Sequence, residues 1–321
     1  MSFGDKLSLM KLKKKVFIDD YVGLSTRLEV LAMGFLISEY FGHEVCLNWN
    51  ELDSIHVIGA RFERCGLWGR LDAIKVRDYT PELFYRIADH ARVRLRTHEG
   101  PRHLLSRMYL PTARRVKLRP DLIQTIRDTF GRYTGRPVVG VHIRRGDFRV
   151  ANPDEFDVTA KLWPAVPDWW YEHVMHKLQA AFPDVVFFVS CTGSLEEFPN
   201  LTKNFDVFDL PTTYPYDKRG AGHASLRHPA ADLFALGCCS LIVGTPCSTF
   251  THYAAHMLGE PSTVLIPPPR MVRAQPAFAQ LCLYGRSAFD WYAACRQGLE
   301  QTAVDDPRSA LTPGPARLDW M

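Results

Sequence analysis

The sequence predicts an α/β protein made of two Rossmann-type domains with a cleft between them. Three observations favour this fold class. The chain has 321 residues, which is enough for two domains of ordinary size. A strand, a glycine-containing loop, a helix and a second strand follow one another within residues 16–49, in the order of a βαβ unit. Short β-branched strands then alternate with helical segments over residues 138–266.

The first half of the chain carries the predicted βαβ unit. Its strands are expected at Val16–Ile18 and Val45–Trp49. Ser25 or Thr26 is the expected N-cap of the helix between them. Apolar residues repeat behind that cap at helical spacing, at Leu28, Leu31, Ala32, Phe35 and Leu36. Residues 51–115 show less regular patterns.

A domain boundary is expected near residues 110–118, where a basic segment precedes Pro120. Proline at the first helical position begins a helix that runs to about Tyr133. We therefore assign residues 1–115 to an N-terminal domain and residues 116–321 to a C-terminal domain.

The second half of the chain alternates strands and helices more clearly. The expected strands are 138–141, 185–190, 205–208, 240–244 and 263–266. The expected helices are 167–181, 229–236, 248–258 and 287–301. Residues 149–167 are predicted to form a long functional loop, and the tail from Asp305 is expected to be loose.

Composition narrows the classes of partner. The net charge of +4 favours an anionic ligand, but no stripe of lysine and arginine interleaved with aromatic residues indicates nucleic acid. The eight cysteines have no even spacing, so we expect free, mostly buried thiols in a reducing cytoplasm.

No transmembrane segment is expected. The uncharged window Leu233–Thr251 contains Gly237, Gly244 and Pro246, which indicates a buried helix end, a strand, a loop and a helix start. The segment Lys11–Lys15 offers a peripheral contact with an anionic membrane surface; a solvated approach to a strand is the alternative interpretation.

Two arginines follow the predicted strand at residues 138–141, in the sequence His142-Ile143-Arg144-Arg145-Gly146-Asp147. In open α/β sheets, ligands bind beyond the carboxyl ends of the strands. Adjacent arginines there could form bidentate contacts with phosphate, and Gly146 would let the backbone turn close to it. A solvated turn is the alternative interpretation.

A second strand end shows a phosphate-binding pattern. A tight proline turn follows Gly244 and leads to Ser248 and Thr249 at a helix N-terminus, where free N–H groups and hydroxyls could hold phosphate. An ordinary N-cap is the alternative. Asp232 lies on the preceding helix, where its carboxylate could accept from the N1–H and N2–H edge of a guanine.

The sequence lacks the motifs of several other enzyme classes. No Asp-x-Asp sequence is present, so a metal-bridged diphosphate is not expected. His252 and His256 lie four residues apart, but the residues between them lack the glutamate of a zinc protease, and packing is the expected role. The sequence Gly220-Ala221-Gly222 lacks the third glycine and the preceding strand of a dinucleotide fingerprint.

Three pieces of the chain together resemble the fucosyltransferase superfamily, which includes α1,2- and α1,6-fucosyltransferases, a bacterial nodulation-factor enzyme and protein O-fucosyltransferases. The pieces are Gly23–Leu28, His142–Asp147, and Asp232 with Ser248-Thr249-Phe250. Their order and spacing match the family, and the resemblance covers roughly residues 16–50 and 137–260.

The resemblance implies a GT-B fold, with two Rossmann-like domains facing each other across a cleft. It implies GDP-β-L-fucose as donor, inversion at the anomeric carbon, a glycan or glycoconjugate acceptor, no obligatory metal and no cofactor. Two alternatives stay open. One is a transferase of this fold that uses another nucleotide sugar, and the other is a non-catalytic module that binds sugar nucleotides or glycans.

The resemblance also implies residue roles. Arg144 would bind the donor diphosphate and stabilise the leaving GDP, and Arg145 would assist or orient the acceptor. Asp232 would read guanine. Donor phosphate, ribose or base would be held by His142, Ser248, Thr249 and Phe250. The cleft would be faced from the N-terminal domain by Gly23, Leu24, Ser25, Thr26 and Arg27.

The sequence departs from the family pattern at two places. Ser25-Thr26 replaces the usual Gly-Asn, so hydroxyls would act in place of an amide. The strand that ends at Ser190 continues with Cys191 and Thr192 and lacks the acid found in the family. No general base is fixed by the pattern. The candidates are Asp147, Asp154 and Glu155.

Overall fold

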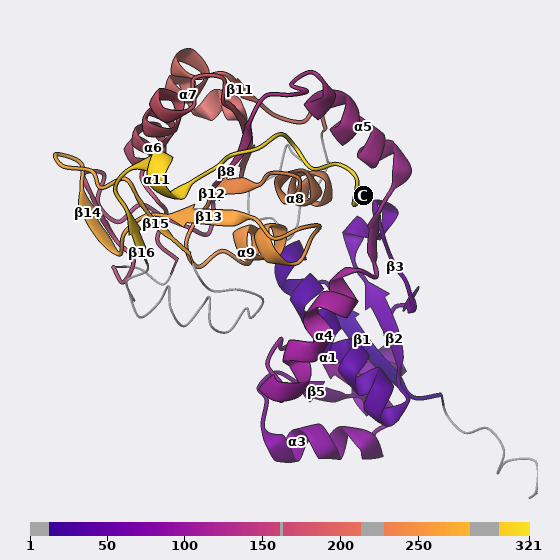
Figure 1. Cartoon of the computed structure of the whole chain (residues 1–321). Coiled ribbons are helices and arrows are strands. Elements are labelled where there is room, and N and C mark those ends of the chain that lie inside the picture. Colours follow the sequence, from indigo (N-terminus) through magenta and orange to yellow (C-terminus); the bar gives the residue numbers. More distant parts are fainter. Residues whose placement is uncertain (1–12, 161–162, 213–227, 283–301) are drawn as a thin grey trace, which may run out of the picture. The chain divides into compact units, whose positions relative to one another are not determined.

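The chain divides into two compact units, each with its own sheet, which confirms the predicted α/β class (Figure 1). Unit 1 is Met1–Lys117 and unit 2 is Leu118–Met321. The computed structural model describes residues 13–160, 163–212, 228–282 and 302–321. The expected helix at 287–301 and the sequence Gly220–Gly222 lie outside the described residues.

Unit 1 is built on a five-stranded parallel sheet. Its strands, in spatial order, are β4 (Ala60–Phe62), β2 (Glu44–Asn48), β1 (Lys15–Asp19), β6 (Arg92–Leu95) and β5 (Ile74–Val76). Helix α1 (Leu24–Phe41) joins β1 to the parallel β2, which confirms the predicted βαβ unit. Most of α1 is buried, because it packs against the sheet and against α4 (Arg102–Ala113).

Shorter elements complete unit 1. They are η2 (Asn50–Asp53), β3 (Ile55–Val57), α2 (Leu67–Asp72), α3 (Pro81–Arg86), η3 (Ile87–Asp89) and β7 (Val116–Leu118). Strands β3 and β7 form a separate two-stranded sheet.

The start of α1 differs from the prediction. Gly23 occupies the N-cap position and the helix begins at Leu24, so Ser25 and Thr26 lie in the first turn. No side chain caps the helix. The hydroxyl pattern predicts the cap two or three residues too late, because the extended backbone of Gly23 (φ −58°, ψ 157°) already leads the chain into the helix.

Unit 2 contains a seven-stranded sheet that is parallel from β11 to β13. Its strands, in spatial order, are β11 (Val207–Phe208), β10 (Val186–Cys191), β8 (Val138–Ile143), β12 (Leu241–Val243), β13 (Thr263–Ile266), β15 (Ala279–Leu281) and β16 (Thr302–Val304). All residues of β8 are buried. A Cβ at Gly140 would lie only 2.9 Å from Leu236 Cδ2, so glycine allows the neighbouring helix to pack closely on β8.

The described helices of unit 2 are α5 (Pro120–Gly131), α6 (Asp168–Ala181), η4 (Leu195–Glu197), α7 (Pro199–Asn204), α8 (Pro229–Gly237), α9 (Thr249–His256) and α11 (Pro307–Ala310). The longer described helices of unit 2 lie where the sequence predicts them, and the short helices η4, α7 and α11 were not predicted. The expected loop 149–167 contains a strand, β9 (Glu155–Asp157), which pairs antiparallel with β14 (Arg270–Val272). Its partner lies far along the chain, so the local sequence does not reveal it.

The C-terminal tail is packed, which corrects the expected loose tail. Gly314 O accepts from the amide of Val138 at 2.9 Å. Arg317 donates from its amide to Cys238 O at 2.8 Å, and its guanidinium binds Cys239 O at 3.0 Å. The Trp320 ring stacks on Phe234, with ring centroids 5.6 Å apart. The yellow end of the chain therefore runs beside α8 (Figure 1).

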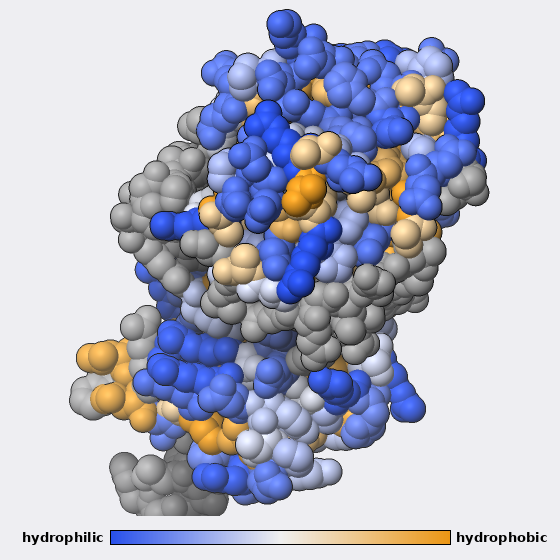
Figure 2. Space-filling model, turned by 90° about the vertical axis from the view of Figure 1, so that its left-hand side faces the viewer, coloured by the Kyte–Doolittle hydropathy of each residue, from blue (hydrophilic) through white to orange (hydrophobic). Residues whose placement is uncertain are grey.

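The uncharged window at residues 233–251 folds as predicted, into the end of α8, strand β12 and the start of α9. In the described part of the chain, no helix is long and apolar enough to cross a membrane. The seven cysteines of the described residues form no disulfide bond with one another and are buried, as expected. On the face shown in Figure 2, hydrophilic residues predominate and hydrophobic ones gather in small patches.

We expect the substitution Trp320→Ala to lower the free energy of unfolding by about 2 kcal/mol, because it removes the ring that packs on Phe234. Urea denaturation followed by circular dichroism measures the change. Tyr85→Ala is the control, since that residue is 72% exposed and the substitution should change the free energy little. Equal stability of the Trp320 variant and the wild type would contradict a packed tail.

Candidate functional site

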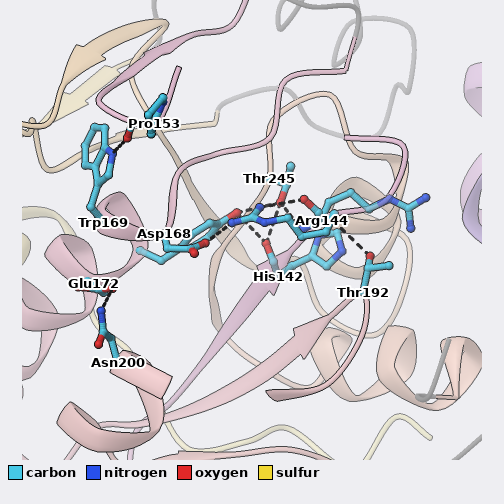
Figure 3. A network of polar contacts seen from close by, with 11 residues as sticks. His142, Arg144, Pro153, Asp168, Trp169, Glu172, Thr192, Asn200 and Thr245 are labelled. Carbon is cyan, nitrogen blue, oxygen red and sulfur yellow. Dashed lines mark hydrogen bonds and ion pairs between the residues drawn. The ribbon is translucent and has the colours of Figure 1, made fainter. Parts of the chain in front are cut away.

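Three parallel strands of unit 2 end at the same edge of the sheet. Strand β8 pairs in parallel with β10 on one side and β12 on the other, so the segments after their carboxyl ends lie close together. The structure joins them by hydrogen bonds. The amide of Arg144 donates to Thr245 Oγ1 at 3.1 Å, and the amide of Arg145 donates to Thr192 Oγ1 at 3.4 Å (Figure 3).

Arg144 leaves part of its guanidinium accessible. Its side chain is 33% exposed, and Nε and one terminal nitrogen bind Asp147 Oδ1 at 2.9 and 2.8 Å. Gly146 has φ 83°, a left-handed conformation that favours glycine and lets the turn close. Because a guanidinium has five N–H donors, the ion pair with Asp147 leaves donors for a further anion. Asp147 therefore orients Arg144.

Arg145 is held by groups of its own unit. It forms an ion pair with Asp168 at the start of α6, and it donates to the carbonyl oxygen of Arg144 at 3.0 Å. Its guanidinium carbon lies 5.8 Å from the centre of the Phe198 ring. The two arginines thus differ: Arg144 presents an accessible cation, whereas Arg145 joins the turn to α6.

His142 lies at the end of β8 and is buried. Its Nδ1 lies 2.7 Å from Thr251 Oγ1, and its ring stacks on Phe250 with centroids 4.9 Å apart. Burial, reinforced by the neighbouring Arg144 charge, lowers the pKa of His142 to about 3. The neutral imidazole therefore supports the first turn of α9.

The loop between β12 and α9 has a constrained backbone. A Cβ at Gly244 would lie 2.4 Å from Thr251 Cγ2, so only glycine fits there. Cys247 has φ 60°, a left-handed conformation that costs about 1–3 kcal/mol in a residue with a side chain. Ser248 occupies the N-cap of α9 without a side-chain capping bond, and Thr249 is the first helical residue. Sequence patterns mark the turn but give no signal for the strain at Cys247.

Asp232 lies in the first turn of α8 and is buried. Its Oδ2 accepts from Ser190 Oγ at the end of β10, at 3.1 Å. The helix begins behind His228, whose Nδ1 accepts from the amide of Ala231 at 3.3 Å. Ser190 is the partner that sequence analysis did not find, because it lies 42 positions away in the sequence.

The segment Gly23–Arg27 of unit 1, which is the N-cap and first turn of α1, is tied to the core through its arginine. Arg27 is fully buried and binds both carboxylate oxygens of Glu51, at 2.9 and 2.7 Å. Asp20 lies 3.2 Å from the same guanidinium, and Val22 O accepts from its Nε. Arg27 therefore anchors the start of α1. At this helix start, a Cβ at Gly23 would meet open space, whereas Leu24 and Ser25 are buried.

The remaining base candidates lie on and before β9. Asp154 is exposed and lies 3.4 Å from an Arg273 guanidinium nitrogen. Glu155 is exposed at the start of β9, opposite Val272 of β14. Within the described residues, no ion pair engages Glu155, so its carboxylate is the least committed of the three.

A group of possible metal ligands, Glu44, Cys46 and Glu63, lies on unit 1. Cations of the chain already occupy its carboxylates: Lys15 binds Glu63 at 2.5 Å and Arg61 binds Glu44 at 2.8 Å. Burial raises the pKa of the Cys46 thiol to about 12, which keeps it protonated. The group therefore fits a metal poorly.

The described lysines of the predicted membrane-contact segment, Lys13–Lys15, are partly engaged within unit 1. Lys14 donates to Ala88 O at 2.7 Å, and Lys15 binds Glu63. Lys13 is exposed.

Comparison with known proteins identifies the fold. No family model matches the sequence, and no curated protein matches it. A solved structure of an Arabidopsis thaliana FUT1 mutant in complex with GDP matches with a TM-score of 0.50 and 12% identity, over 84% of this chain and 74% of that chain. The chain therefore has a fucosyltransferase-like fold, as the sequence motifs predict.

In two further matches, the aligned region covers nearly all of the solved chain. Fucosyltransferase NodZ from Bradyrhizobium matches with a TM-score of 0.48 and 15% identity, over 84% of this chain and 99% of that chain. POFUT1 in complex with GDP-fucose matches with a TM-score of 0.48 and 8% identity, over 80% of this chain and 98% of that chain.

We expect Arg27→Ala to lower the free energy of unfolding by about 3 kcal/mol, because it leaves Glu51 buried without its cation. Thermal and urea denaturation measure the change. Arg61→Ala removes an exposed ion pair with Glu44 and should change the free energy of unfolding little. Equal losses in the two variants would show that Arg27 does not anchor the start of α1.

The pKa of His142 predicts a dependence of stability on pH. The pKa of about 3 in the folded state lies below that of an unfolded histidine, about 6.5, so the unfolded state binds more protons in acid. This contribution is complete above pH 6.5 and is lost as the pH falls toward 3.

Between pH 7 and pH 5, we expect the free energy of unfolding of the wild type to fall by about 2 kcal/mol more than that of His142→Gln. Urea denaturation at the two pH values measures the difference, with the exposed His56 replaced by Gln as control. The same pH dependence in both variants and the wild type would argue against a neutral buried His142.

Proposed function

We propose that the protein is an inverting glycosyltransferase that transfers L-fucose from GDP-β-L-fucose to a glycan or glycoconjugate. The accessible guanidinium of Arg144, at the carboxyl edge of the central strand β8, carries the proposal. It lies where open α/β sheets bind ligands. A solved protein of similar fold is in complex with GDP, which supports a guanine nucleotide as part of the donor.

The transfer breaks the bond between C1 of fucose and the β-phosphate oxygen, and negative charge grows on the departing GDP. Arg144 would neutralise that charge with the N–H groups that Asp147 does not use. The amides at the start of α9, with the hydroxyls of Ser248 and Thr249, would add donors. Phe250 and His142, stacked on each other, would support this part of the donor site.

The acceptor hydroxyl attacks C1 from the face opposite the diphosphate, which inverts the configuration, and its proton passes to a base. Glu155 fits this role best, since Asp147 is paired with Arg144 and Asp154 lies beside Arg273. Departure of GDP would lead, so a weak base suffices. Arg145, held by Asp168, would act by placing Arg144.

A GT-B arrangement would divide the work between the two units. Residues 116–321 would bind the nucleotide sugar, and residues 1–115, including the start of α1 at Gly23, would bind the acceptor. Asp232, whose second oxygen binds Ser190, would accept from the N1–H and N2–H groups of guanine. A cytoplasmic location fits the free thiols of the described cysteines. We propose that the reaction needs no metal ion, because Arg144 and the helix N-terminus supply positive charge to the leaving group.

We expect Arg144→Ala to lower kcat for GDP release from GDP-fucose by at least about 100-fold, because it removes the cation that stabilises the leaving group. Arg132→Ala, at the exposed end of α5, is the matched control and should leave kcat unchanged. Near-normal turnover of the Arg144 variant would refute its role.

Donor class is tested separately by thermal shift. GDP should raise the Tm of the wild type, whereas UDP and ADP should not; the reverse order would sink the guanine assignment and favour another nucleotide sugar. Binding of GDP-fucose without hydrolysis or transfer to any glycan would favour a non-catalytic module. Loss of turnover on addition of a chelator would contradict metal independence.

A further inference from the structure

Two buried hydroxyl groups converge on one carbonyl oxygen at the end of β8. Thr245 Oγ1 donates to His142 O at 2.8 Å (Figure 3). Tyr171 Oη donates to the same oxygen at 3.1 Å. The two hydroxyls also lie 2.9 Å apart. Thr245 follows β12 and Tyr171 lies on α6, so three elements meet at this point.

The same threonine hydroxyl also holds the next part of the chain. Thr245 Oγ1 accepts from the amide of Arg144 at 3.1 Å while it donates to His142 O. The one hydroxyl group thus binds the residue before Ile143 with its proton and the residue after Ile143 with a lone pair. Thr245 and Tyr171 are both fully buried, and hydrogen bonds shielded from water hold geometry tightly.

The turn that follows β8, residues 144–147, is called the arginine turn. Helix α6 contacts this turn and the strand end before it at two points that are one helical turn apart. Asp168 binds the Arg145 side chain, and Tyr171, three residues later, binds the main chain at His142. Burial raises the pKa of Tyr171 to about 12, so the hydroxyl keeps its proton at neutral pH. Rotation of the turn would break both contacts.

We propose that Thr245 and Tyr171 are positioning residues that fix the backbone of Arg144, so that its guanidinium meets the leaving diphosphate in one orientation. The inference rests on the proposed function of Arg144. In this proposal, two hydroxyls that do not contact the substrate affect the rate through the position of Arg144. A displacement of about 1 Å at a reacting group can cost about 100-fold in rate, so a hydrogen bond at the backbone has a measurable effect.

The test compares Thr245→Val, which keeps the shape but removes the hydroxyl, with Thr245→Ser, which keeps the hydroxyl. Thr245→Val should lower kcat about tenfold or more with little change in KM for the donor, and Thr245→Ser should restore kcat to within about threefold. Tyr171→Phe should have a smaller effect, because Thr245 still binds His142 O. Thr129→Val and Tyr133→Phe, in α5 and just after it, are the controls and should leave kcat unchanged.

Amide hydrogen exchange gives a readout that does not depend on activity. The Arg144 amide should exchange about tenfold faster in Thr245→Val than in the wild type or in Thr245→Ser. Unchanged protection of that amide, or a kcat of Thr245→Val within twofold of the wild type, would overturn the proposal. An inactive wild type would instead contradict the proposed function, and the exchange measurement would still decide whether the hydroxyls hold the turn. Circular dichroism verifies that each variant folds.

Discussion

The pairing of β8 on both edges constrains everything built at the end of the sheet of unit 2. Its residues are buried without exception, and they pair with β10 over the whole strand and with β12 at Val139–Val141. Because buried peptide groups must find partners, the strand cannot shift register without losing several hydrogen bonds at once. The arginine turn that follows therefore starts from a fixed point. The fixed end of β8 therefore limits the positions that Arg144 and Arg145 can take.

Patterns local in sequence predicted the framework of the fold. The βαβ unit at the N-terminus and the strands 138–141 and 263–266 were found because β-branched runs and helical periodicity need no knowledge of distant residues. The packed tail was missed for the opposite reason. Its stability comes from Trp320 on Phe234 and from Arg317 at Cys238 and Cys239, contacts between segments far apart in the chain. Its proline-rich, polar sequence carries no trace of them.

In the candidate site, too, some features follow from local sequence and others depend on distant residues. The position of Arg144 just after a strand and of Ser248–Phe250 at a helix start was predictable, because glycine, proline and charged residues are common where strands end and helices begin. The residues that hold them were not predictable. Thr245 contacts Arg144 across 101 positions of sequence, and Ser190 contacts Asp232 across 42. Arg27 shows the converse, since a residue expected at a ligand site is buried against Glu51. Charge alone does not distinguish an arginine that binds a ligand from one that closes a core.

The left-handed backbone at Cys247 has a consequence for engineering. Glycine adopts φ 60° without strain, so replacing Cys247 by glycine would remove the local backbone cost. The same change would also remove a buried side chain and give the unfolded chain more conformations, and both effects oppose the gain. In the folded state it would widen the range of conformations open to the turn before α9. The residue at this position thus balances backbone strain against the rigidity of the turn.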